Sequence, residues 1–174
     1  MTSKVTIIDC GTGNLNSVKR SLDILGISSK ITSDPLDIGD AEKIILPGVG
    51  HFGKAMANLK RLKLIEPLEQ AVLLDRRPIL GICLGMELMA KKSEEGNALG
   101  LGWIDAEIVR FNISNKERYK VPHIGWNQIK IVRNSALLKD VPDGSEFYFL
   151  HSFHLKINDP SVLISESRYE VKFA

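Results

Sequence analysis

The sequence predicts an α/β fold that begins with a mostly parallel sheet and ends in an antiparallel or mixed extension of that sheet. Two observations support this fold class. Up to Gly96, short apolar runs alternate with amphipathic helical segments, and this alternation implies right-handed crossovers between parallel strands. Beyond Gly96, strand-like runs follow one another with little helix between them. The 174 residues contain no repeat or linker, so we expect a single domain spanning 1–174.

The individual elements follow from capping residues, glycines and apolar periodicity. Asn14 can cap a helix with an apolar face, and Gly26 can end it. In the first half we expect strand Lys4–Asp9, helix Leu15–Leu25, strands Ser29–Thr32 and Lys43–Leu46, helices His51–Leu62 and Ile65–Leu74, strand Pro78–Ile82 and helix Leu84–Lys92. In the second half we expect strands Trp103–Phe111, Asn127–Val132, Glu146–Phe153 and Val162–Ser165.

The composition excludes several kinds of partner. Hydrophobic residues make up 44% of the chain and charged residues 25%, which is ordinary for a soluble globular protein. The net charge of +2 and the scattered Lys and Arg provide no arm for nucleic acid, and no apolar stretch suits a signal peptide or a membrane span. The two cysteines favour a reducing cytoplasm over a disulfide scaffold. The four histidines lack metal-ligand spacing with the cysteines, so we expect no metal and no cofactor.

The segment GICLG, Gly81 to Gly85, predicts a nucleophile. A strand ends there, one residue turns sharply and a helix begins, and the two glycines leave room for a strained elbow. Cys83 would lie at a helix N-terminus, which favours the thiolate, and the N–H of Leu84 could hold an oxyanion. The structural alternative is a buried, inert cysteine, which is how we interpret Cys10. The flanking G-x-C-x-G between strand and helix favours the nucleophile at Cys83.

The segment PGVGHFG contains the pattern G-x-G-x-x-G at Gly48, Gly50 and Gly53. A dinucleotide-binding interpretation would place this pattern in the first β-α turn, with an acidic residue ending the following strand. Here it follows the third strand, and Glu66 and Glu69 fall within a helix. We therefore interpret it as a backbone loop that faces Cys83 and supplies a second N–H for an oxyanion.

Two further segments, PHIGWN and FYFLHSFH, are dense in aromatic and polar side chains. On their own they indicate a turn and a core strand, with His123 and His151 as satisfied histidines. Together with other blocks, they make the chain resemble the glutamine amidotransferase subunits of imidazole glycerol phosphate synthase, which are class I, triad-type amidotransferases. The six matching blocks run in family order across nearly the whole chain: IIDCGTGNLNSV, ILPGVGHFGKAM, GICLGMELM, EEGNALGLGW, VPHIGWN and FYFLHSFH.

The resemblance implies a flavodoxin-like, three-layer fold and a cytoplasmic glutaminase. In that family a cysteine attacks the side-chain amide of glutamine, a histidine moves the proton, and a glutamate orients the histidine. The ammonia passes to a partner synthase with a (β/α)8 barrel, which makes imidazole glycerol phosphate in histidine biosynthesis. The implied roles are nucleophile for Cys83; oxyanion donors for Val49 and Leu84; glutamine contacts for Gly50, Glu87, Ser152 and Phe153; and partner contacts for Asn14, Trp126, Asn127 and Tyr148.

This chain departs from the family pattern at two points. None of its histidines, at 51, 123, 151 and 154, begins the family's H-P-E motif, so Cys83 has no general base among these residues. The sequence stops at EVKFA, in an apolar strand, and we expect a truncated domain without its last strand and helix. Glu87 replaces the family's glutamine, and its charge would disfavour the Cys83 thiolate.

Three alternatives to the histidine-pathway subunit stay open. A non-catalytic docking or regulatory homologue would explain Glu87 and the absent H-P-E, although the intact elbow opposes it. A paralogue that feeds ammonia to a sugar-modifying enzyme for surface polysaccharides is suggested by GLGWIDAEIVRF. A chaperone or deglycase-like enzyme shares the cysteine elbow but lacks the PGVG and HSF blocks.

Overall fold

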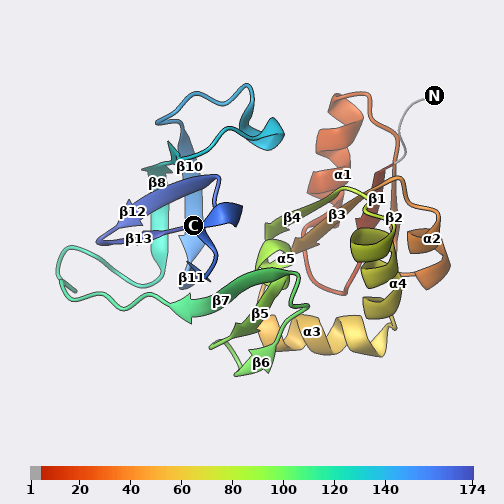
Figure 1. Cartoon of the computed structure of the whole chain (residues 1–174), viewed down its shortest axis with the longest axis horizontal. Coiled ribbons are helices and arrows are strands. Elements are labelled where there is room, and N and C mark those ends of the chain that lie inside the picture. Colours follow the sequence, from red (N-terminus) through yellow and green to blue (C-terminus); the bar gives the residue numbers. More distant parts are fainter. Residues whose placement is uncertain (1–4) are drawn as a thin grey trace. The chain divides into compact units, whose positions relative to one another are not determined.

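The computed structural model describes residues 5–174, which form two compact units. We call the part up to Trp103 the N-terminal unit and Ile104–Ala174 the C-terminal unit, and we describe each by itself (Figure 1). Lys4, the first residue of the first predicted strand, lies outside the described residues. Within residues 5–174, every helix is too short or too polar to cross a membrane.

The N-terminal unit is built on a parallel sheet of four strands, as predicted. The strands are β1 (Val5–Ile8), β2 (Ser29–Thr32), β3 (Lys43–Gly48) and β4 (Ile79–Cys83), in the order β2-β1-β3-β4. Every pairing among them is parallel, and their apolar side chains form much of the core. Parallel strands share one carboxyl edge, so the chain leaves β3 and β4 at the same side of the sheet.

The predicted helices of this unit up to Leu74 are present, and the first has its predicted cap at Asn14. They are α1 (Leu15–Ile24), α3 (Phe52–Arg61) and α4 (Ile65–Glu69), and α4 continues as a π-helical turn over Gln70–Leu74. The Asn14 side chain accepts a hydrogen bond from the Ser17 N–H at 3.4 Å, at the start of α1. Phe52 and Leu59 bury the apolar face of α3 completely.

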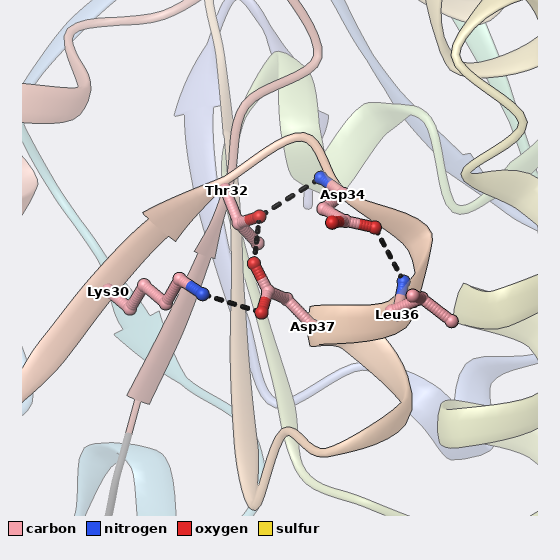
Figure 2. A network of polar contacts seen from close by, with 5 residues as sticks. All are labelled: Lys30, Thr32, Asp34, Leu36 and Asp37. Carbon is pink, nitrogen blue, oxygen red and sulfur yellow. Dashed lines mark hydrogen bonds and ion pairs between the residues drawn. The ribbon is translucent and has the colours of Figure 1, made fainter.

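A short helix, α2 (Pro35–Gly39), was not predicted. Asp34 caps it by accepting the Leu36 N–H at 2.9 Å, and Pro35 fixes its first turn. Thr32, at the end of β2, accepts the Asp34 N–H at 2.9 Å and donates to Asp37 at 2.5 Å (Figure 2). Lys30 completes the network with an ion pair to the same carboxylate. The dipeptide Asp-Pro was the sequence signal for this helix.

The predicted helix Leu84–Lys92 is wrong beyond its first turn. The structure has α5 only over Leu84–Glu87, followed by β5 (Ala90–Ser93), which pairs antiparallel with β6 (Ala98–Leu99). Leu88, Met89 and Ala90 are all buried, whereas a surface helix would bury only one side of such a run. The returning chain also takes their carbonyls, since the N–H of Leu101 donates to Leu88 O at 2.8 Å.

The C-terminal unit consists of antiparallel strands, as predicted. β7 (Ile104–Arg110) pairs with β11 (Phe153–Ile157), and β8 (His123–Gln128) pairs with β10 (Glu146–His151). A third group joins β12 (Ser165–Tyr169) to β9 (Lys130–Ile131) and to β13 (Val171–Phe173). The core is aromatic: Phe111, Ile113 and Phe173 are buried, with Tyr119, Val121, Phe149, Tyr169 and Val171 packed against them.

Strand boundaries in this unit differ from the prediction at three places. The strand predicted at Asn127–Val132 begins earlier, at His123, and is interrupted before β9. The strand predicted at Glu146–Phe153 is divided at Ser152 into β10 and β11. The strand predicted at Val162–Ser165 is wrong, because Asp159 caps a 3₁₀ helix over Pro160–Val162 by accepting the Ser161 N–H at 2.8 Å.

Candidate active site

Cys83 lies in the elbow that its sequence context predicted. It joins β4 to α5 with φ 54° and ψ −121°, a region that residues other than glycine rarely adopt. The two flanking glycines are required by space: a β-carbon at Gly85 would lie 1.7 Å from the Leu46 carbonyl oxygen, and one at Gly81 would lie 2.5 Å from Met86 Cα. The sequence therefore places a strained, exposed cysteine at the carboxyl edge of a parallel sheet.

The surroundings of Cys83 keep its thiol protonated. Partial burial raises the thiol pKa, the Glu87 carboxylate raises it further, and a hydrogen bond from the Leu84 backbone opposes both. The expected thiolate-favouring effect of the helix is outweighed, since α5 has only four residues. A thiol in this state needs a base to accept its proton before it can attack a carbonyl carbon.

The glycine-rich loop after β3 lies beside the elbow. Gly48 pairs with Cys83 in the β3–β4 register, and a β-carbon at Gly48 would lie 3.0 Å from Gly85 N. Val49 and Gly50 follow directly and are exposed, and Gly50 has φ +101°. The structure thus brings the two segments of the predicted oxyanion donors, Val49 and Leu84, to one edge of the sheet.

Glu87 shares its surroundings with a second carboxyl group that the sequence analysis missed. Burial and the charge of Glu95 raise the pKa of Glu87 to about 7. Glu95 itself is anchored, because its Oε2 accepts the N–H of Phe52 at 2.6 Å, at the start of α3. At neutral pH a large fraction of Glu87 is therefore protonated, and a protonated carboxyl can donate a hydrogen bond as well as accept one. The acidic pair in SEEG was the available sequence signal.

His51, which lies within the glycine-rich segment PGVGHFG, caps helix α3. His51 Nδ1 accepts the Gly53 N–H at 3.1 Å, and its ring packs on Gly96, where a β-carbon would lie 2.5 Å from Cε1. Among the described residues of the N-terminal unit, no histidine is hydrogen-bonded to Cys83. The prediction that Cys10 is a small core residue is confirmed, since it is fully buried.

In the C-terminal unit, Ser152 joins β10 to β11 and Phe153 is the first residue of β11; we call these two residues the Ser152–Phe153 connection. The Ser152 carbonyl accepts the Phe111 N–H at 3.0 Å. The Phe153 carbonyl lies 2.9 Å from His151 Nδ1. Both residues are half-buried, and the carbonyl of each takes part in one of these two contacts.

The predicted partner contacts of this unit divide between two faces of the β8–β10 ribbon. Trp126 and Tyr148 are opposite each other in the register, with ring centroids 5.8 Å apart and exposed fractions of 70% and 57%. Asn127 is on the other face, since successive residues alternate along a strand. Its amide donates to the Arg168 carbonyl at 3.0 Å and so supports the neighbouring strand β12.

A strained cysteine between a parallel strand and a helix, beside a glycine-rich loop from the adjacent strand, is the arrangement expected of a cysteine-dependent acyl-transfer enzyme. The sequence matches the glutamine amidotransferase class-I family over residues 6–170, and the chain belongs to that family.

Its relatives within the family include subunits of one synthase. The chain is 43% identical over 169 residues to imidazole glycerol phosphate synthase subunit HisH 2 of Methanococcus maripaludis, with 97% of this chain and 83% of that protein covered. It is 42% identical over 170 residues to subunit HisH 1 of Campylobacter jejuni, with the same coverage.

Solved structures agree with the fold. A crystal structure of a glutamine amidotransferase superposes with a TM-score of 0.68 at 14% identity, covering 94% of this chain and 84% of that one. The PurLQS structure from Thermotoga maritima gives a TM-score of 0.69 at 18% identity, covering 98% of this chain and 77% of that one. These similarities confirm the α/β fold of the class I amidotransferase type.

Proposed function

We propose that this chain is the glutaminase subunit of an imidazole glycerol phosphate synthase, with Cys83 as the nucleophile. It hydrolyses glutamine to glutamate and delivers the ammonia to a synthase partner in histidine biosynthesis. The observation that carries this proposal is the strained Cys83 elbow beside the Gly48–Gly50 loop. Its identity of about 40% to HisH subunits over nearly the whole chain supports the same function.

The chemistry follows from the positions around Cys83. The sulfur attacks the side-chain amide carbon of glutamine, and the carbonyl oxygen becomes an oxyanion facing the N–H groups of Leu84 and Val49. Collapse of this intermediate breaks the C–N bond, and the nitrogen leaves as ammonia once it has received a proton. Water then hydrolyses the thioester, which releases glutamate and restores the thiol. The proton carrier is the histidine of the H-P-E motif, which these 174 residues do not contain.

An exposed apolar face supports docking on the synthase. The antiparallel register places Ile124 and Leu150 on the same face of the ribbon as Trp126 and Tyr148, and all four side chains are exposed. Contiguous exposed apolar side chains with large aromatics are typical of protein–protein interfaces. We assign this face to a (β/α)8-barrel partner, with Asn14 as a further contact from the N-terminal unit.

The test of this proposal is glutamine hydrolysis by the chain extended through an H-P-E motif and docked on a barrel synthase. We expect glutamate formation that Cys83→Ala abolishes and that the imidazole glycerol phosphate precursor stimulates. Robust hydrolysis that survives Cys83→Ala would refute the assignment of the nucleophile. Stimulation only by a sugar acceptor would favour the polysaccharide paralogue instead.

A non-catalytic homologue is the second candidate function. The raised pKa of Cys83 and the carboxyl group of Glu87 beside it favour this alternative. It predicts that the extended chain binds its partner tightly, yet forms no glutamate under any condition.

A further inference from the structure

Two histidines face each other at the end of the β8–β10 ribbon. His123 begins β8, His151 ends β10, and the antiparallel register places them directly opposite each other. His123 Nδ1 lies 2.9 Å from His151 Nε2, and His151 Nδ1 lies 2.9 Å from the carbonyl oxygen of Phe153. These two contacts form a continuous chain from a buried ring to the backbone of the Ser152–Phe153 connection.

Only one arrangement of protons on neutral rings satisfies both contacts. The Phe153 carbonyl can only accept, so His151 must carry its proton on Nδ1 and leave Nε2 as an acceptor. His123 must then donate from its own Nδ1. Burial lowers the pKa of both rings, and that of His151 to about 4, so both are neutral at pH 7.

The rings around this pair keep it in place. His123 is 2% exposed and stacks on Tyr169, with centroids 4.0 Å apart, and on Phe149 at 5.2 Å. The His151 ring lies edge-on to Phe111 at 5.0 Å. Neither histidine ring can rotate without losing one of these hydrogen bonds. The pair therefore holds the Phe153 carbonyl in a fixed position.

We propose that His123 and His151 are positioning residues that fix the Ser152–Phe153 connection for glutamine binding. The proposal rests on the proposed function and on the glutamine contacts that the family resemblance implies for Ser152 and Phe153. In it, His123 fixes the tautomer of His151, and His151 holds the Phe153 carbonyl. The Phe111 N–H holds the Ser152 carbonyl from the other side at 3.0 Å. Neither histidine acts on the reacting atoms.

The first test examines the tautomers directly. In the 174-residue chain labelled with ¹⁵N-histidine, we expect His123 and His151 to be Nδ1–H tautomers at pH 7, and loss of each signal on substitution assigns it. A proton on Nε2 of His151 would overturn the proposal, because the chain to Phe153 would then be broken.

The second test measures glutamine capture through inactivation of Cys83 by 6-diazo-5-oxo-norleucine, a glutamine analogue. His123→Phe keeps an aromatic ring but removes the donor, and we expect it to raise the half-saturating analogue concentration about fivefold. His123→Asn places an amide N–H where Nδ1 stood and should restore capture. Phe149→Leu is the control: it loosens the same stack but keeps both hydrogen bonds, so it should raise the half-saturating concentration less than His123→Phe does.

The outcomes separate this proposal from the proposed function. Reaction of Cys83 with iodoacetamide reports an intact elbow in every variant. If the parent reacts with iodoacetamide but never with the glutamine analogue, the proposed function fails, and the link from the histidines to glutamine fails with it. If the parent captures the analogue and folded His123→Phe captures it equally well, only the positioning role is overturned.

Discussion

At the scale of single residues, the proposed chemistry depends on the backbone conformation of Cys83. A positive φ at a residue other than glycine costs free energy, and the surrounding chain supplies that free energy only if it packs closely. Gly85 allows this packing by contacting the Leu46 carbonyl directly. The geometry of the proposed nucleophile therefore depends on a residue to which we assign no part in the reaction.

Gly85→Ala should destabilise the protein by about 3 kcal/mol or more, because the new methyl group overlaps backbone atoms. Chemical denaturation of the N-terminal unit measures this change. Gly39→Ala is the matched control, since no atom lies within 4 Å of the added β-carbon, and it should change stability by less than about 1 kcal/mol. Equal effects of the two substitutions would show that the elbow is not tightly packed.

Glu87→Gln should lower the apparent pKa of the Cys83 thiol, because the carboxylate of Glu87 raises it. The pH dependence of Cys83 alkylation measures this shift. In the extended chain docked on its synthase, the same substitution should raise kcat/KM for glutamine. Glu66→Gln, which removes the same charge from an exposed position on α4, is the control. If both quantities stay unchanged in Glu87→Gln, the side chain points away from the thiol.

At the scale of elements, the β8–β10 ribbon has two different faces. One face is exposed and apolar and is assigned to the partner. The other contains the paired histidines and the aromatic core. Alternation along the two strands is enough to separate the two faces, so under our proposals one ribbon has both a docking and a supporting role.

Trp126→Ala should weaken binding of the synthase at least about tenfold, as expected for a central aromatic contact. Its effect on folding should be small, since the side chain is 70% exposed. Titration calorimetry with the barrel subunit measures the affinity. Leu99→Ala, an equally exposed apolar residue on β6, is the control and should bind normally. The docking face is misassigned if Leu99→Ala weakens binding as much as Trp126→Ala.

The stability of the C-terminal unit should depend on pH through His151. The pKa of His151 is lowered from 6.5 to about 4 in the folded chain, so the unfolded chain binds more protons between these values. The contribution of neutral His151 to the free energy of unfolding is therefore fully present above pH 6.5 and is lost as the pH drops towards 4. His151→Phe should flatten this part of the profile in denaturation experiments at a series of pH values. An unchanged slope would mean that His151 does not titrate on unfolding.

Local sequence signals predicted most helices and strands. They failed where contacts between residues distant in the sequence determine the secondary structure. The cap at Asn14 and the elbow at Cys83 were both visible in the sequence, whereas the capping role of His51 was not predicted. The segment after Glu87 was assigned to a helix because nothing local shows that the returning chain at Leu101 takes its carbonyls. The proton arrangement of His123 and His151 depends on the β8–β10 register, which the sequence alone does not fix.

At the scale of the whole molecule, the chain contains the elbow, the glycine-rich loop and the face that we assign to docking, but no H-P-E motif to supply the proposed proton carrier. We expect the 174-residue chain to turn over glutamine about 10² to 10⁴ times more slowly than the chain extended through an H-P-E motif. Ammonia release by the two proteins, each with the synthase, provides the comparison. Equal rates would mean that another group supplies the proton.

The central claim is that Cys83 is the residue that glutamine acylates, and covalent capture tests it most directly. The chain is treated with a chloroketone analogue of glutamine, and the adduct is located by mass spectrometry. Slow labelling is compatible with the account, because the thiol pKa is raised and the base is absent. We predict an adduct on Cys83 and none on buried Cys10. An adduct on Cys10 with Cys83 unmodified would contradict the claim.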